Sequence, residues 1–193
     1  FADTAGGFWL RARQLSIGFQ GNATDALWFD KARLQAIKKF LNDNKDNYVI
    51  FCNFTPELVE LYQACSELGY NIDIYSGDIK SLSNYEAYSA NLEKGIVKEG
   101  SNVIIANFAS GAAGMNWQNY SHCIISSLPL YKDYAQALKR IHRIGQKETV
   151  FYHLFLQDNW LDNSMMKALD NSVQYSEDMF SSDILRIHQM TSD

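Results

Sequence analysis

The sequence predicts an α/β domain in which a parallel sheet is covered by helices on both faces. Short apolar segments rich in β-branched and aromatic residues alternate with segments of helical periodicity through most of the chain. The segment 48–52, YVIFC, is apolar throughout, which is typical of a strand buried on both faces. Ligands in such sheets bind at the carboxyl ends of the strands, so loops that follow strands are expected to share one edge.

The first half of the chain predicts two helices around that strand. Residues 1–29 carry scattered glycines and aromatic side chains and predict no compact unit. Leucine and isoleucine at helical spacing predict a helix over 30–41, before the strand at 48–52. After this strand, Thr55 is expected to cap a helix that has proline in its first position and ends near residue 69.

The second half continues the alternation of strands and helices. A strand is predicted at 71–75, and Ser83 with Glu86 three residues later predicts a capping box at the start of the next helix. The remaining predicted elements are strands at 103–107, 123–126 and 149–156, a helix over 136–146, a helix from 160 to near 175, and a short helix around 184–187.

Composition and charge restrict the classes of function. The chain has 193 residues, 47% hydrophobic and 20% charged, which is ordinary for a globular protein. No apolar run is long enough to span a membrane, and a chain that begins at Phe1 is expected to be a piece of a longer intracellular protein. The net charge of −5 argues against a broad nucleic-acid footprint, so any contact with DNA must be local.

The cysteines and histidines predict no metal site. Cys52, Cys65 and Cys123 are widely separated and lack the C-x-x-C spacing of zinc ligands or a disulfide framework. The four histidines are equally scattered. We therefore expect three buried structural thiols and a reducing compartment.

The segment 136–146, QALKRIHRIGQ, stands out because it is strongly basic in an acidic chain. On a helix at about 100° per residue, Gln136, Arg140 and Arg143 fall within about 60° of one another. The opposite, buried face is expected to consist of Ala137, Leu138, Ile141 and Ile144. Arginines at this spacing can lie on an ordinary solvated surface helix, or they can donate planar, permanently charged hydrogen bonds to phosphate oxygens.

Three other segments carry polar or glycine-bearing loops directly after predicted strands. They are YVIFCNFT at 48–55, IYSGD at 74–78 and VIIANFASGAAGMNW at 103–117. Taken alone, each is a buried strand or a glycine turn. Successive backbone N–H groups in the third loop can also form an anion site.

Together these four segments resemble motifs of the superfamily 2 helicases. QALKRIHRIGQ resembles motif VI, and its His-Arg-Ile-Gly-Gln ending resembles the Swi/Snf branch, the ATP-driven translocases on double-stranded DNA. The segments 48–55 and 103–117 resemble motifs IV and V, and 74–78 resembles the motif between them. The resemblance covers about residues 31 to 180. It implies a RecA-like second lobe at 31–158, a connection from a missing first lobe at 1–30, and a bracing helical extension at 159–193.

The resemblance also implies a role for particular residues. Arg143 would be an arginine finger on ATP, assisted by Arg140. Gln136, Gly114 and Asn116 would contact the nucleotide. The residues expected at the DNA backbone are Asn53, Ser76, Gly77, Ser110 and Gly111. The segment from Arg13 to Leu15 would pack against the lobe.

ATP and magnesium would be held mainly by the first lobe. The chain has no G-x-x-x-x-G-K-[ST] phosphate loop and no Asp-Glu pair. The isolated chain is therefore expected to be inactive, and the partners implied are the first lobe and double-stranded DNA, with no membrane. The location implied is cytoplasmic for a prokaryotic or viral source and nuclear for a eukaryotic one. The alternatives are a helicase-like binding module without turnover, and an unrelated nucleotide-binding α/β domain.

Overall fold

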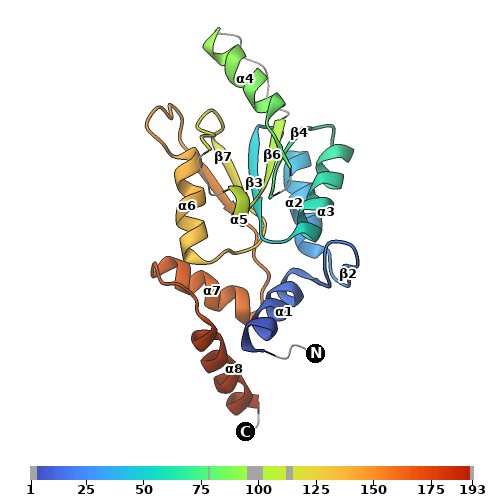
Figure 1. Cartoon of the computed structure of the whole chain (residues 1–193), viewed down its shortest axis with the longest axis vertical. Coiled ribbons are helices and arrows are strands. Elements are labelled where there is room, and N and C mark those ends of the chain that lie inside the picture. Colours follow the sequence, from blue (N-terminus) through green and yellow to red (C-terminus); the bar gives the residue numbers. More distant parts are fainter. Residues whose placement is uncertain (1–3, 78, 95–101, 112–114, 192–193) are drawn as a thin grey trace.

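A six-stranded sheet forms the centre of the fold in the computed structural model, which describes residues 4–77, 79–94, 102–111 and 115–191 (Figure 1). Its strand order is β5-β4-β6-β3-β7-β8, and every neighbouring pair is parallel except the edge pair of β5 with β4. The strands are β3 (Tyr48–Cys52), β4 (Asn71–Tyr75), β5 (Lys80–Ser81), β6 (Asn102–Asn107), β7 (His122–Ile125) and β8 (Phe151–Leu154). The predicted α/β class with a parallel sheet is confirmed.

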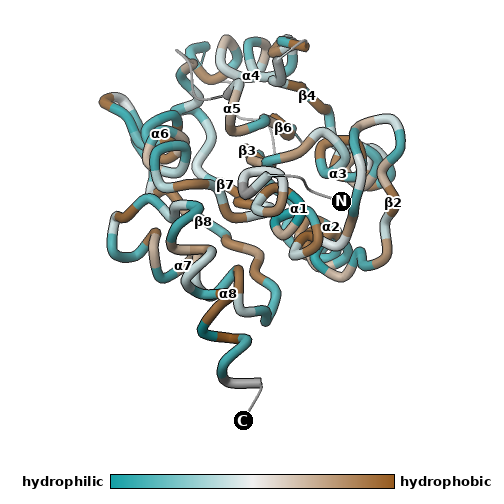
Figure 2. The backbone as a smooth tube through the Cα atoms, turned by 60° about the horizontal axis from the view of Figure 1, so that its bottom comes forward, coloured by the Kyte–Doolittle hydropathy of each residue, from teal (hydrophilic) through white to brown (hydrophobic). Residues whose placement is uncertain are grey.

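Helices cover both faces of this sheet. They are α1 (Ala5–Ile17), α2 (Ala32–Asp43), α3 (Thr55–Glu67), α4 (Ser83–Glu93), α5 (Phe108–Gly111), α6 (Tyr131–Ile141), α7 (Trp160–Asp170) and α8 (Glu177–Thr191). Side chains of the fully buried strand β3 alternate between two cores. Val49 and Phe51 join the core under α6 and α7, whereas Ile50 and Cys52 join the core under α2 and α3. Figure 2 shows the apolar stretches of β3 and β6 near the centre of the molecule.

Two helix starts differ from the sequence prediction because distant or buried groups cap them. Thr55 is the first residue of α3 rather than its cap, and the buried carboxylate of Glu57 accepts from the backbone N–H groups of the two residues before the helix, at 3.1 and 3.2 Å. Ser83 likewise is the first residue of α4, so the predicted capping box is wrong. Buried Asp73 of β4 accepts from two N–H groups in the first turn of α4, at 3.2 and 2.8 Å.

The first 29 residues form a helix and a hairpin, although their sequence predicted no compact unit. Helix α1 is followed by the short antiparallel strands β1 (Phe19–Gln20) and β2 (Leu27–Trp28). Gly18 ends α1 at φ 108°, where a Cβ atom would lie 2.0 Å from the carbonyl oxygen of Asp30. Helix α1 is stabilised by tertiary contacts, because its apolar residues pack on α7 and α8. These contacts are distant in sequence, so local spacing did not predict the helix.

Helices α7 and α8 pack against α1 at one end of the molecule, and α8 extends toward the C terminus (Figures 1 and 2). The indole of Trp9 lies 5.0 Å from the ring of Phe180 and 5.4 Å from that of Tyr175. A buried ion pair of 2.5 Å joins Arg33 of α2 to Asp162 of α7. No helix in the described part of the chain is long and apolar enough to cross a membrane.

The three cysteines are free and buried, as predicted. Burial raises the pKa of each thiol, to about 12 for Cys65. No group of three or more His, Cys, Asp or Glu side chains that could hold a metal ion occurs among the described residues.

Candidate functional site

The basic segment is a helix followed by a turn, and the predicted helix over 136–146 is therefore wrong in its second half. Helix α6 ends at Ile141, and the N–H of Gln146 donates to the carbonyl oxygen of Arg143 at 3.0 Å. Arg143 thus lies beyond the helix and does not share a helical face with Gln136. Ile144, predicted to be buried, is completely exposed. We call residues 142–146 the arginine turn.

Contacts with the segment before β7 hold the arginine turn. Gly145 adopts φ 107°, and a Cβ atom there would lie 3.1 Å from the side-chain amide of Gln118. The amide of Gln146 donates to the carbonyl oxygen of Tyr120 at 3.1 Å. The positive φ of Gly145 is not a helical conformation, and the chain has already left the helix at His142, the C-cap of α6 with ψ 86°.

Arg140 is half-buried and joins α6 to the segment that follows α5. Its guanidinium donates to the carbonyl oxygen of Met115 at 3.3 Å, and its own carbonyl accepts from the N–H of Trp117 at 2.9 Å. Burial and the neighbouring Arg143 guanidinium lower the pKa of Arg140. Because arginine remains charged at neutral pH, two adjacent positive charges are present.

Arg143 itself is exposed and lines an open pocket of about 500 Å³. The other residues around this pocket are Asn116, Lys139, His142 and Ile144. Guanidinium, ammonium and amide groups are suitable donors for phosphate oxygens. The sequence motifs indicate Arg143 and Asn116 for this role but not Lys139 or His142, which lie in the same basic segment. Half-buried Gln136 does not line the pocket, and Gly114 lies outside the described residues.

The loops after β4 and β6 lie side by side, as expected for the carboxyl edge of a parallel sheet. A Cβ atom at Gly77 would be 3.7 Å from the hydroxyl of Ser110. Ser76 closes a tight turn with Ile79: its N–H donates to the carbonyl oxygen of Ile79 at 2.7 Å, and its hydroxyl accepts from the N–H of Ile79 at 3.3 Å. Gly111 is the last residue of α5. We call Ser76, Gly77, Ser110 and Gly111 the serine loops.

Asn53, at the end of β3, uses its side-chain amide inside the lobe. Its Oδ1 accepts from the Arg13 guanidinium at 2.7 Å, and its Nδ2 donates to the Ser127 hydroxyl at 2.7 Å and to the Leu128 carbonyl oxygen at 3.1 Å. Arg13 therefore packs on the lobe, as predicted. Gln14 is also buried, whereas Leu15 is exposed.

The arginine turn and the serine loops lie toward opposite ends of the strands. Helix α6 connects the C-terminal end of β7 to the N-terminal end of the parallel strand β8, so the C-terminal end of α6 lies toward the side where the parallel strands begin. The serine loops follow the ends of β4 and β6. The described segment 115–121, which precedes β7, contacts α6 near the arginine turn, because the N–H of Trp117 donates to the carbonyl oxygen of Arg140.

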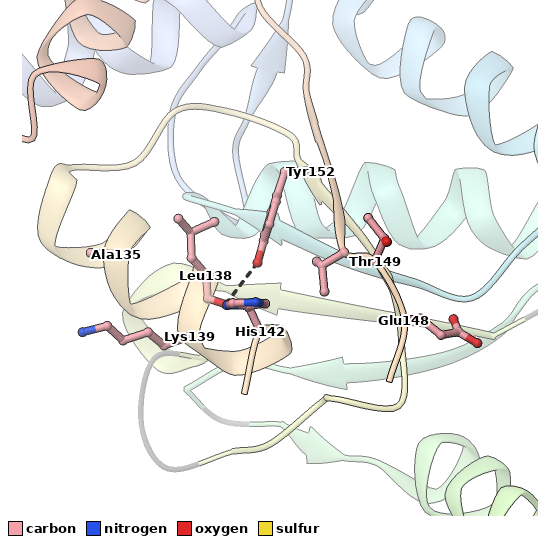
Figure 3. Close-up of a pocket in the computed structure, with 8 residues that line it drawn as sticks. Ala135, Leu138, Lys139, His142, Glu148, Thr149 and Tyr152 are labelled. Carbon is pink, nitrogen blue, oxygen red and sulfur yellow. Dashed lines mark hydrogen bonds between the residues drawn. The ribbon is translucent and has the colours of Figure 1, made fainter. Parts of the chain in front are cut away.

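A second open pocket, of about 580 Å³, lies between α6 and β8 (Figure 3). The hydroxyl of Tyr152 donates to the carbonyl oxygen of Leu138 at 3.2 Å across it. Ala135 and Val150 make its lining largely apolar, and Lys139 and His142 are shared with the pocket at Arg143. No sequence pattern predicts this pocket, because it depends on how β8 packs beside α6.

A RecA-like lobe of a superfamily 2 helicase is the class of protein that this sheet and its basic turn define. The profile of the helicase conserved C-terminal domain family matches residues 32–145, more than half of the chain. The chain belongs to this family, as a second RecA-like lobe of the Swi/Snf-like branch.

Known relatives and a solved structure agree with this assignment. The DNA repair protein RAD5 of Eremothecium gossypii is 30% identical over 128 residues, which are 65% of this chain and 10% of that protein. The DNA repair protein RAD5 of Candida albicans is 30% identical over 95 residues, which are 48% of this chain and 8% of that protein. The chain thus spans about a tenth of the length of these relatives. The crystal structure of the C-terminal part of the Fun30 ATPase domain has the same fold, with a TM-score of 0.57 and 23% identity, covering 70% of this chain and 44% of that one.

Proposed function

We propose that this lobe works in an ATP-dependent translocase on double-stranded DNA and that Arg143 is its arginine finger. The supporting observation is that Arg143 is exposed at an open pocket, in a turn whose backbone is held by Gly145 against Gln118. A positioned guanidinium can stabilise the charge that spreads over the oxygens of a transferring phosphoryl group. Such an arginine contributes about 10³ to 10⁵ in rate.

The rest of the nucleotide site would come from the first lobe of the same protein. ATP with magnesium supplies the phosphoryl group that is transferred to water. This chain carries cations for that phosphate but, among its described residues, no acidic cluster for the metal. Arg140 assists Arg143 by its charge, Gln136 orients the motif, and Asn116 and Gly114 contact the nucleotide when the two lobes close.

The serine loops would hold the DNA backbone. Adjacent Ser110 and Gly77 offer a hydroxyl group and a close backbone approach, which suit phosphate oxygens but carry no base specificity. DNA as the substrate is supported by the name of the curated relatives, DNA repair protein RAD5. Residues 1–30 would connect to the first lobe and residues 159–193 would brace this one. The location that follows is intracellular, and nuclear if the source is eukaryotic.

ATP hydrolysis by the full-length protein, with and without duplex DNA, tests this proposal. We expect DNA to stimulate the wild-type protein, while Arg143→Ala and the isolated lobe remain folded without activity. Lys132→Ala is the matched control, because Lys132 is an exposed cation at the other end of α6, and it should behave as wild type. Normal DNA-stimulated hydrolysis by Arg143→Ala would mean that Arg143 is an ordinary surface arginine, whereas no hydrolysis by the wild-type protein would favour a binding module with a helicase fold.

A further inference from the structure

Arg13 of α1 contacts residues that are distant in sequence as well as Trp9 of its own helix. Its guanidinium lies 5.6 Å from the ring of Trp9 and 5.4 Å from the ring of Phe54, and it donates to Asn53 at 2.7 Å and to the Leu128 carbonyl oxygen at 3.3 Å. A charged donor makes the bond to Asn53 stronger than a neutral one. This bond links α1 to the residue that follows β3.

Asn53 passes this constraint to β6. Its Oδ1 is occupied by Arg13 and its Nδ2 by Ser127, so the side-chain amide has a single orientation. The backbone carbonyl oxygen of Asn53 accepts from Nδ2 of Asn107 at 3.1 Å. Asn107 is the last residue of β6.

Asn107 in turn fixes the start of α5. Its Oδ1 accepts from the N–H of Ala109 at 2.9 Å, in the first turn of this four-residue helix. A helix so short has little stability of its own, and its direction depends on such contacts. Ser110, the next residue, faces the loop of Gly77.

We propose that Arg13 is a positioning residue for the DNA-binding serine loop, acting through Asn53 and Asn107 on α5. The chain of hydrogen bonds runs without a gap from the guanidinium to the N–H of Ala109. Displacement of α1 would carry the Arg13 donor away from Asn53, and loss of this bond would change the direction of the Ser110 hydroxyl. The DNA part of this inference rests on the proposed function.

The first experiment measures the local structure and does not depend on DNA. Hydrogen exchange of the Ala109 and Ser110 amides is followed in the full-length protein, in wild type, Arg13→Ala and Arg11→Ala. Arg11 lies on the same helix, and the only hydrogen bond of its guanidinium in the described part of the chain is to Gln14. We expect exchange at these amides to be about three- to tenfold faster in Arg13→Ala alone, because one hydrogen bond is lost from the chain. Equal exchange rates in the three proteins would overturn the proposal.

The second experiment measures DNA half-saturation of ATP hydrolysis and kcat at saturating DNA. Arg13→Ala is expected to raise the half-saturating DNA concentration about three- to tenfold, with kcat within about twofold of wild type.

The combination of Arg13→Ala with Ser110→Ala should weaken DNA binding by less than the product of the two single effects, because both act at one contact. Ile37→Val in the opposite core controls for a general loss of stability and should leave half-saturation unchanged. Independent, multiplying effects of Arg13→Ala and Ser110→Ala would overturn the coupling. If Ser110→Ala alone changes nothing, the DNA role of the loop fails, and the exchange measurement still decides whether Arg13 positions α5.

Discussion

The carbonyl oxygen of Arg140 accepts a hydrogen bond of 2.9 Å from the backbone N–H of Trp117, and the Arg140 guanidinium donates to Met115 nearby. The segments 103–117 and 136–146 are thereby joined by a hydrogen bond between backbone groups as well as by a side-chain bond. Trp117 is completely buried against Phe51 and Tyr75. The position of the arginine turn therefore depends on the sheet beneath Trp117, and substitutions that loosen either contact should affect the turn.

Gly145→Ala should distort the arginine turn. The added methyl group would lie 3.1 Å from the Gln118 amide, at a φ of 107° that L side chains rarely adopt. We expect a loss of about 1–3 kcal/mol in the free energy of unfolding and a lower kcat in the full-length protein. Urea unfolding of the isolated lobe and steady-state kinetics measure the two effects.

Gly69→Ala is the matched control for this prediction. Gly69 also has a positive φ, 76°, but no atom lies within 4 Å of its Cβ position. It should lose about 1 kcal/mol of stability without a change in kcat. An equal loss of kcat in both variants would mean that the turn has no special role.

Asp162→Ala should strongly destabilise the lobe. The Arg33 and Asp162 side chains are only 2% and 3% exposed, so removal of the carboxylate leaves a buried, uncompensated guanidinium. The expected loss is about 3–5 kcal/mol, whereas exposed Glu67→Ala, which breaks the Lys38 pair, should cost less than about 1 kcal/mol. The double variant Arg33→Met with Asp162→Leu should recover most of the loss, and failure to recover would point to the other bonds of Arg33.

Glu57 should make the stability of the lobe decline as pH rises. Its buried carboxylate accepts from the hydroxyls of Ser126 and Ser127 at 2.8 and 2.9 Å, yet burial raises its pKa above the ordinary value of 4.5. The folded chain thus holds this proton more tightly than the unfolded chain. The resulting stabilisation is complete below the ordinary pKa and is lost as pH rises through the raised pKa.

Two substitutions separate the charge of Glu57 from its hydrogen bonds. Glu57→Gln keeps an acceptor for the backbone N–H groups and should remove this pH dependence. Glu57→Ala leaves several buried donors unpaired and should cost about 3 kcal/mol or more at all pH values. Urea unfolding between pH 4 and 8 measures both. The interpretation fails if Glu57→Gln keeps the wild-type pH dependence.

His153 should make the stability of the lobe decline as pH falls, which is opposite to the effect of Glu57. Burial and neighbouring His122, whose Nδ1 lies 3.1 Å from its Nε2, lower the pKa of His153 below 6.5. The unfolded chain then binds this proton more tightly, so stability is full above about pH 6.5 and falls as pH drops toward the lowered pKa. His153→Gln should reduce the loss of stability between pH 7.5 and 5.5, whereas exposed His142→Gln should not. If His153→Gln lost as much free energy of unfolding between pH 7.5 and 5.5 as wild type, this role would be ruled out.

Patterns local in the sequence predicted the sheet well. The uniformly apolar segment 48–52 is the strand β3, paired on both sides, and polar or small residues after β4 and β6 meet at one edge. Gly145 carried the signal for the end of α6, because glycine past a helical pattern favours a stop, but the basic face suggested that the helix continued. The caps from Asp73 and Glu57 and the docking of α1 depend on residues distant in sequence or on burial, which local spacing does not encode.

The rate of ATP cleavage in a single turnover tests the assignment of Arg143 most directly. The full-length protein is saturated with ATP and duplex DNA, and the reaction is stopped by rapid quenching within the first turnover. Nucleotide affinity is measured separately for wild type, Arg143→Ala and the control Lys132→Ala. We expect Arg143→Ala to slow the chemical step by about 10³ or more while it binds ATP within a few-fold of wild type. Cleavage at the wild-type rate, or a loss that saturating ATP restores, would contradict it.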